Sequence, residues 1–270
     1  MLKLLLLIAV PFMVYAEESC PDLFANRGSG LVNSQQAFTC YQASITPTSS
    51  RRDVTHALNQ MAYLKFFIAE NFMKEKEDTL LESINISEKA LSKFGPKYNL
   101  VEYRKLSDEE RKVVAEALYT YGLTVARYVD VKGFLEALKR MDDIKKSMLT
   151  IIRLKEEATA FYGAHRVLGI FHMKVPAIAG GDIEISKEYL PKAVQSTLFS
   201  GELSRYPLNN TVYADLLYKL GKTQESCHQL RLVAALTDEE VSNLDNGLLF
   251  ETLGNVRDAK VKMINHKCAN

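Results

Sequence analysis

Apolar side chains recur at helical spacing along nearly the whole chain after about residue 50. In segment 51–73, one broad face carries Val54, Leu58, Met61, Leu64, Phe67 and Ile68. A spacing of three to four residues is typical of an amphipathic helix whose apolar stripe faces a core. No strand pattern competes with it, so the sequence predicts an all-α protein.

The periodic segments form five predicted helix pairs. They are 51–73 with 79–95, 106–129 with 133–154, 156–175 with 183–198, 209–220 with 221–236, and 238–266 divided at Gly254. Gly95 followed by Pro96 indicates a helix C-terminus. Ser107 with Glu110 three residues later fits a capping box, and Asp238 is a candidate N-cap.

Two segments share a local pattern, "LLYKLGKTQESCHQL" (216–230) and "LFETLGNVRDAKVKM" (249–263). In each, a Leu-Gly pair precedes a polar turn and then a small residue. Gly221 and Gly254 would end the first helix, and Cys227 or Ala259 would pack in the second. This is the logic of a tetratricopeptide-like repeat, in which stacked antiparallel helix pairs form an α-solenoid. The repeats are degenerate, so a plain helical bundle stays open.

The first residues, "MLKLLLLIAVPFMVYAEE", place one lysine before an apolar run that ends at Ala16. This order predicts a secretory signal peptide over 1–16, although a membrane anchor stays open. The run falls short of the ~20 apolar residues that a spanning helix needs. Glu17, Glu18 and Ser19 precede Cys20, which does not fit a lipoprotein signal. We expect a periplasmic or secreted protein, soluble after cleavage.

Beyond the leader, composition divides the chain into two parts. Residues 17–50 are polar and rich in Gly, Ser, Thr and Pro, so we expect loop or short helices there. Residues 51–270 form the predicted helical repeat domain. Of 34 basic residues Lys3 lies in the leader, which leaves 33 to balance 33 acidic residues. A nearly neutral chain with dispersed charge gives no indication of nucleic-acid binding.

Four cysteines, an even number, suggest disulfides in an exported chain. Three pairings are open, and the two local ones, Cys20 with Cys40 and Cys227 with Cys268, are favoured. Each would add roughly 3–4 kcal/mol on the chain-entropy model. The spacings do not resemble a zinc site.

Gly180-Gly181-Asp182 lies between two predicted helices and could hold a phosphate, a metal or only a turn. A phosphate loop needs a preceding strand and a following Lys-Ser/Thr, and a calcium loop needs more oxygen ligands. The sequence supplies neither. We therefore predict a helix–helix turn, in which the glycines take positive φ and Asp182 caps the next helix.

The remaining candidates for chemistry are few. His165 and His172, seven residues apart, share a helix face but lack the spacing of a metal pair, so no metal and no cofactor are predicted. Arg166 could bind turn carbonyls, and Tyr119, Tyr121, Tyr128 and Tyr162 pack in a core or line a ligand channel. No nucleophile with a partner set is visible, which predicts that the protein is not an enzyme.

Segment 162–194, "YGAHRVLGIFHMKVPAIAGGDIEISKEYLPKAV", resembles the signature segment of the TRAP-transporter-associated T-component family (TatT). The residues that fit are Pro176, Gly180, Gly181, Asp182, Glu184 and Ala193. Ser186, Pro191 and the lack of a lipidation signal depart from it. The resemblance implies a periplasmic fold of tetratricopeptide-like repeats. It also implies an apolar ligand in a central channel and a periplasmic solute-binding protein as partner.

Two functions follow as hypotheses. The first is a T-component-like binding protein of a solute uptake system. The second is a scaffold that docks another envelope protein on a concave face. The candidate ligand-binding residues are Tyr119, Tyr162, His165 and Arg166. The sequence leaves a homo-oligomer open.

Overall fold

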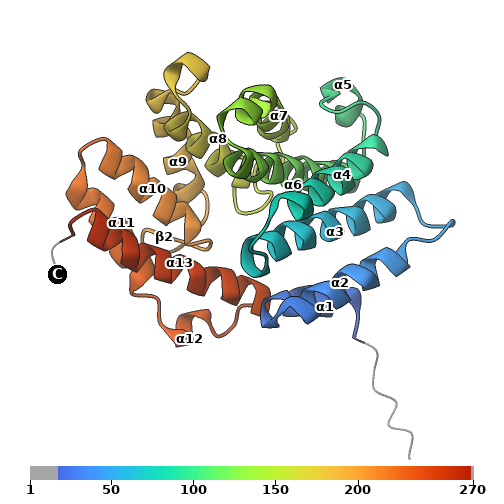
Figure 1. Ribbon diagram of the computed structural model, residues 1–270, viewed down its shortest axis with the longest axis horizontal. Coiled ribbons are helices and arrows are strands. Elements are labelled where there is room, and N and C mark those ends of the chain that lie inside the picture. The colour runs from blue at the N-terminus through green and yellow to red at the C-terminus, as the bar shows by residue number, and fades with distance from the viewer. Residues whose placement is uncertain (1–17, 269–270) are drawn as a thin grey trace, which may run out of the picture.

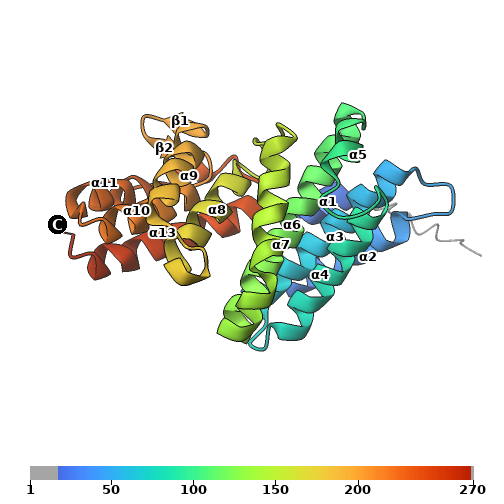
Figure 2. The ribbon, with the colours of Figure 1, turned by 90° about the horizontal axis from the view of Figure 1, so that it is seen from above.

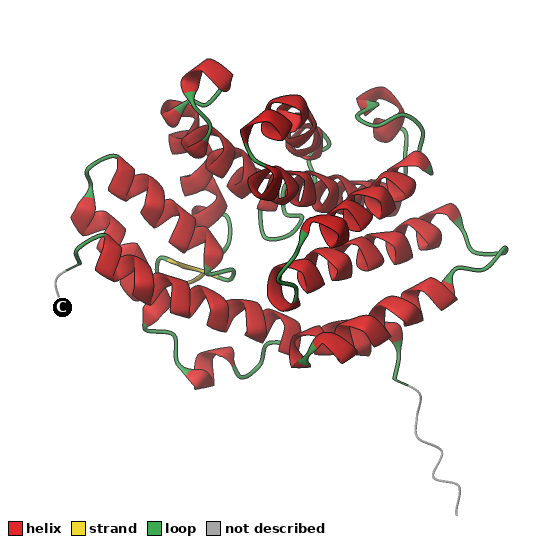
Figure 3. Cartoon of the chain, in the orientation of Figure 1, coloured by secondary structure: helices red, strands yellow, loops and turns green. Residues whose placement is uncertain are grey.

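Helices make up nearly all the regular structure in residues 18–268, the part of the chain that this computed structural model describes (Figure 3). The predicted all-α class, with helices packed in pairs, is confirmed. The predicted signal peptide over 1–16 lies outside the described residues. The strands within them are β1 (Leu198–Ser200) and β2 (Leu203–Ser204), which pair in a short antiparallel hairpin.

The helices of the first half are α1 (Cys20–Ala25), η1 (Asn26–Ser29), α2 (Leu31–Ser44), α3 (Arg51–Phe72), α4 (Glu77–Ser92), α5 (Leu100–Arg104), α6 (Asp108–Lys132) and α7 (Phe134–Arg153). Those of the second half are α8 (Gly163–Lys174), η2 (Ala177–Ala179), α9 (Ile183–Gln195), α10 (Leu208–Lys219), α11 (Thr223–Ala234), α12 (Asp238–Val241) and α13 (Asn246–Asn265). The neighbouring pairs α3–α4, α6–α7, α8–α9 and α10–α11 pack together, as predicted.

Local signals explain several helix ends. The predicted capping box at Ser107 is present, because its hydroxyl accepts from the Glu110 backbone while the Glu110 carboxylate reaches back to Ser107 N–H. Gly95 follows the end of α4 with φ of +97°. At α12 the N-cap is Thr237 rather than Asp238. The threonine hydroxyl binds the backbone of Glu240 three residues on, which Asp238 at the first helical position could not do.

Residues 17–50 are more helical than predicted. They contain α1, η1 and the fourteen-residue α2 where we expected loop or short helices. Half of the residues of α2 are polar, so its helical period is weak in the sequence. Its few buried positions, Ala37 and Tyr41 among them, pack onto α3, and this contact stabilises a helix that local pattern does not indicate.

Both favoured cysteine pairings are confirmed. Cys20 bonds to Cys40, and Cys227 bonds to Cys268, each with a Cα–Cα distance of 5.5 Å. The first disulfide joins α1 to α2. The second ties the end of the described chain to α11. Disulfides of this kind are compatible with an oxidising compartment.

The predicted fifth helix pair is wrong. Residues 246–265 form one continuous helix, α13, and Gly254 lies inside it instead of ending it. Gly221, the matching glycine of the other segment, does end α10 and has φ of +76°. The same Leu-Gly pair therefore gives a turn in one place and helix interior in the other.

α13 closes the arc of helix pairs (Figure 1). It packs on α11 and α10 of the second half and extends back to η1 and α1 at the start of the chain. Seen from above, α3, α4, α6 and α7 form one block and α8 to α11 another (Figure 2). Because α13 joins the last helix pairs to the first helices of the chain, residues from both halves line the interior of the arc.

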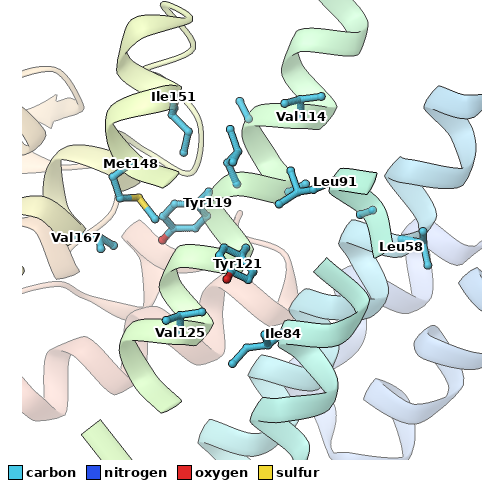
Figure 4. Close-up of a cluster of buried hydrophobic side chains, with 14 of the residues drawn as sticks. Leu58, Ile84, Leu91, Val114, Tyr119, Tyr121, Val125, Met148, Ile151 and Val167 are labelled. Carbon is cyan, nitrogen blue, oxygen red and sulfur yellow. The ribbon is translucent and has the colours of Figure 1, made fainter. Parts of the chain in front are cut away.

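The core follows the two blocks. One large cluster runs from α2 through α8, and Figure 4 shows part of it around Leu91, Tyr121 and Met148. Smaller clusters lie between α9 and α10 and between α11 and α13. Within residues 18–268, no helix is both long enough and apolar enough to cross a membrane.

Candidate functional site

The structure divides the four predicted ligand-binding residues into two pairs. Tyr119 on α6 and Arg166 on α8 meet, since Arg166 Nη2 donates to the Tyr119 hydroxyl at 2.6 Å. The Tyr162 and His165 rings stack on each other at 5.7 Å, and neither lines the cavity beside the first pair. The other two predicted tyrosines, Tyr121 and Tyr128, are buried in the core.

Tyr119 and Arg166 line a cavity inside the closed arc, which we call the central cavity. Its volume is about 280 Å³. Its walls carry the aromatic rings of Phe24, Tyr63, Tyr119, Phe161 and Tyr206, the charged side chains of Arg27, Glu116, Arg166 and Glu251, and the polar side chains of Asn59, Gln60, Thr120 and Thr159. These residues come from both ends and the middle of the chain, so only the closed fold brings them together.

Arg166 is almost fully buried at the central cavity, with 3 % of its surface exposed. Its Nη1 donates to Asn209 Oδ1 at 2.6 Å, and its guanidinium lies 4.7 Å from the Tyr206 ring centroid. Carbonyls of Ala160 and Phe161 accept longer bonds of 3.4 Å. No Asp or Glu among residues 18–268 forms an ion pair with it. A guanidinium does not lose its proton in proteins, so a buried positive charge stands without a counter-charge.

The carbonyls that face Arg166 belong to a strained turn. Ala160, Phe161 and Tyr162 have φ of 51°, 55° and 57°, the left-handed region that costs roughly 1–2 kcal/mol for each non-glycine residue. This turn corrects the predicted helix over 156–175, because α8 begins only at Gly163. In the same turn, the Phe161 carbonyl also accepts a hydrogen bond of 3.2 Å from Asn209 Nδ2. Strain held in place by such bonds is typical of functional sites.

Arg27 and Glu251 form the wall where η1 meets α13. Arg27 Nη2 donates to Glu251 Oε1 at 3.0 Å, and the Tyr63 hydroxyl donates to the same oxygen at 2.9 Å. The Tyr206 hydroxyl donates to Glu251 Oε2 at 3.0 Å. Asp245, the N-cap of α13, lies 3.6 Å from Arg27 Nη1. The Arg27 charge is therefore neutralised within the protein, in contrast to that of Arg166.

Three buried polar atoms at the central cavity have no hydrogen-bond partner among the described residues. They are Arg27 Nε, Asn59 Oδ1 and Glu116 Oε2. Arg27 and Asn59 are each 3 % exposed, whereas the Glu116 side chain is 44 % exposed and its Oε2 lies 4.0 Å from His56 Nδ1. Burial raises the pKa of Glu116, while His56 and Asn59 oppose the rise. Native proteins seldom leave buried polar atoms unpaired, and these three share one cavity.

His165 and His172 lie on one helix face, as predicted, and both rings approach Tyr189, at 5.5 Å and 6.4 Å. His165 Nε2 also lies 2.7 Å from the carboxylate of Glu157. In residues 18–268 no group of three or more His, Cys, Asp or Glu side chains could hold a metal ion. The histidine face therefore packs α8 against α9.

Gly180-Gly181-Asp182 forms the predicted turn between α8 and α9. Gly180 has the predicted positive φ, +90°, but Gly181 does not. Glycine is needed at 181 for another reason, because a Cβ there would lie 1.7 Å from the Val175 carbonyl oxygen. Asp182 is the N-cap of α9, and its carboxylate accepts from the Glu184 N–H at 2.9 Å. The turn is fully accounted for by these backbone contacts.

Ser226, His266 and Asp215 superficially resemble a hydrolase triad. The Ser226 hydroxyl lies 2.8 Å from His266 Nδ1, and His266 Nε2 lies 3.6 Å from Asp215. However, Ser226 has no exposed surface, and its hydroxyl donates to the Ala214 carbonyl at 2.8 Å. A nucleophile must be reachable by substrate, so this network packs α10, α11 and α13 together.

A second concave feature, which we call the apolar groove, lies between α6, α7 and α8. It has a volume of about 580 Å³. Its apolar walls include Phe66, Leu123, Met141, Ile144, Ile170 and Phe171. Arg127 and Lys174 lie on its border. The groove is separate from the central cavity and shares no lining residue with it.

Comparison with known proteins finds no family model that matches the chain and no curated protein similar to it. The resemblance to the T-component family therefore depends on segment 162–194 alone.

Sequence reasoning found Tyr119 and Arg166 but missed most of the central cavity. Arg27 lies in the segment that we expected to be loop or short helices. Glu251 lies in a segment predicted only to pack helices, and Tyr206 lies between two predicted helices. Asn59 and Thr55 are polar residues among the mainly apolar buried positions of α3. A polar residue at a buried position of a helix was the one signal of the central cavity in the sequence.

Proposed function

We propose that this protein is a non-catalytic helical-repeat binding protein and that its central cavity holds a small polar molecule. The observation that carries the proposal is the group of unpartnered buried atoms, Arg27 Nε, Asn59 Oδ1 and Glu116 Oε2, on the walls of one cavity. Each such atom costs free energy of the order of a lost hydrogen bond, about 1–3 kcal/mol. A ligand that pairs with them recovers that cost.

The size and lining of the cavity also support this role. A volume of about 280 Å³ lies at the lower end of ligand pockets, which span roughly 300–1,000 Å³. The aromatic walls offer flat apolar surface, and the few polar groups fix orientation. The occupant is therefore a compact molecule with several hydrogen-bonding groups.

Two of the charged groups of the cavity, Glu251 and Arg166, favour binding over catalysis. Glu251 accepts bonds from Arg27, Tyr63 and Tyr206, so both of its oxygens are already occupied. A general base needs a carboxylate within reach of a substrate proton and free to take it. Arg166 cannot serve as a base because it stays protonated.

The site of action in this proposal is the periplasm or the extracellular space. Two disulfides are compatible with an oxidising compartment. The leader-like sequence at 1–16 supports export, although it lies outside the described residues.

A second candidate function is a T-component-like role in solute uptake. It would place an apolar ligand in the apolar groove and a periplasmic solute-binding protein against the outer surface. The groove of about 580 Å³ with mainly apolar walls favours it. A scaffold for another envelope protein, with no small ligand, is the remaining alternative.

Native mass spectrometry of the exported protein, purified from its own compartment, tests the proposal. We expect a small polar molecule that is retained by the folded protein and released on unfolding. Gln60→Trp, which fills the edge of the central cavity, should abolish retention. Gln36→Trp on the exposed face of α2 makes the same change elsewhere and should not.

Other results would contradict the proposal in distinct ways. A retained apolar molecule, lost on Ala126→Phe in the groove but kept in Gln60→Trp, would favour the T-component-like role. A protein without any small molecule but bound to another envelope protein would favour the scaffold.

A further inference from the structure

The charge of Arg166 sets the first requirement on a ligand. Its hydrogen-bond partners are a tyrosine hydroxyl, an amide oxygen and two carbonyls, all of them neutral. Burying a charge is costly unless another charge compensates it. Arg27, by contrast, has two carboxylates beside it, Glu251 at 3.0 Å and Asp245 at 3.6 Å. Arg166 is therefore the buried arginine of the central cavity that has no carboxylate beside it.

The opposite requirement comes from α3 and α6. Asn59 Nδ2 donates to the Val113 carbonyl at 2.8 Å, which fixes the amide and leaves Asn59 Oδ1 free to accept. Glu116 lies next to it, and its Oε2 accepts no hydrogen bond from the described residues, although His56 Nδ1 lies 4.0 Å away. Two acceptors of which one is a carboxylate match an ammonium group, which donates three hydrogen bonds and carries a positive charge.

From these two groups of residues on the walls of one cavity, we propose that the ligand of the central cavity is a small zwitterion of the free amino acid class. Its carboxylate faces Arg166 and Tyr119, and its ammonium faces Asn59 and Glu116. This inference rests on the proposed function and names the ligand class for it. The aromatic walls of Tyr63, Tyr119 and Tyr206 would cover the remainder of the molecule.

The alternatives fit the cavity less well. A neutral sugar would leave the Arg166 charge uncompensated. A dicarboxylate would bring its second negative charge toward Glu116 or Glu251, where like charges repel. A simple amine would add a positive charge near Arg166. Of these classes, only the zwitterion complements both the Arg166 charge and the acceptors of Asn59 and Glu116.

The test uses the full exported chain after mild unfolding and refolding to remove any retained molecule. Thermal denaturation with each standard amino acid identifies the best ligand. Calorimetry then compares that amino acid with its analogue lacking the carboxylate and its analogue lacking the amine. We expect each analogue to bind roughly 10- to 100-fold more weakly, the effect of losing one charged hydrogen-bond pair.

Two variants assign the ends of the ligand. In Arg166→Gln, the amino acid should bind no better than its analogue without the carboxylate. In Glu116→Gln, it should bind no better than its analogue without the amine. Arg140→Gln, on α7 and paired with Glu136 outside the cavity, should leave both ratios unchanged. The ratio of the affinities for the amino acid and its analogue, taken within one variant, remains valid even if that variant is less stable. Circular dichroism reports whether each variant folds.

Failure of this inference is distinguishable from failure of the proposed function. If no amino acid raises the melting temperature but another polar molecule is retained, the ligand class is wrong and the binding function stands. If Arg166→Gln keeps the preference for the carboxylate, the assignment of Arg166 is wrong. If the native protein retains nothing polar, the proposed function fails and the inference fails with it.

Discussion

Burial lowers the pKa of three histidines, His165, His172 and His266, below the usual value. Glu157 opposes the effect at His165, and Asp215 opposes it at His266. In all three the neutral imidazole is the form that the folded protein favours. When the chain unfolds, each regains an ordinary pKa of about 6.5.

The sign of the resulting pH dependence follows from linkage. Below pH ~6.5 the unfolded chain binds protons that the folded protein does not, so the free energy of unfolding falls as pH decreases. We expect lower stability at about pH 5.5 than at about pH 7.5, measured by urea unfolding. His165→Gln should reduce the difference in stability between the two pH values. The stability that this variant loses at the higher pH measures the cost of removing the imidazole from its packed position. Stability that rises on acidification would refute the prediction.

Two copies of one sequence pattern adopt different structures at the level of the element. Gly221 ends α10 with positive φ, whereas Gly254 lies within α13. α13 is held at its start by Arg27 and at its end by the Cys227–Cys268 disulfide to α11. Because the two ends of α13 are fixed to different parts of the molecule, the helix stays continuous through Gly254, although glycine weakens a helix.

Alanine substitution at the two glycines tests this difference. Gly254→Ala should stabilise the protein by roughly 0.5–1 kcal/mol, because alanine is the better helix former and a Cβ there meets only open space near Arg257. Gly221→Ala should destabilise it, because positive φ strains a residue with a Cβ. Chemical denaturation of both variants measures the effect. Destabilisation by Gly254→Ala would mean that residue 254 is a turn after all.

At the scale of the whole molecule, the closure by α13 creates the central cavity. Gly247, in the first turn of α13, lies directly over the Arg27 guanidinium, and a Cβ there would stand 2.1 Å from Arg27 Cζ. The close approach lets Arg27 reach Glu251 beneath the helix. The two ends of the chain therefore meet through a contact that only glycine permits.

Gly247→Ala should open this closure. We expect a loss of roughly 1–3 kcal/mol in the free energy of unfolding, the usual cost of overpacking a buried site. Hydrogen exchange should become faster in η1 and α13 but stay slow in α4 and α6, which pack mainly on each other and on α3 and α7. Gly254→Ala in the same helix is the matched control. Unchanged exchange in η1 and α13 would show that the closure does not depend on Gly247.

The sequence by itself determined the long helices after residue 50, because they carry their own apolar period and many carry their own caps. Ser107, Asp182 and Gly95 act on neighbours a few residues away, so their effects are readable without knowledge of the fold. Both disulfide pairings were also readable, since each joins cysteines that are close along the chain.

Only the tertiary structure decided where the chain closes and what the closure encloses. Arg27 and Glu251 are 224 residues apart, and no local pattern relates them. The helical state of residues 31–44 and the continuity of α13 depend on packing partners elsewhere in the chain. Local signals decay within a turn or two of helix, whereas burial and charge in the central cavity arise from residues that meet only after the arc has closed.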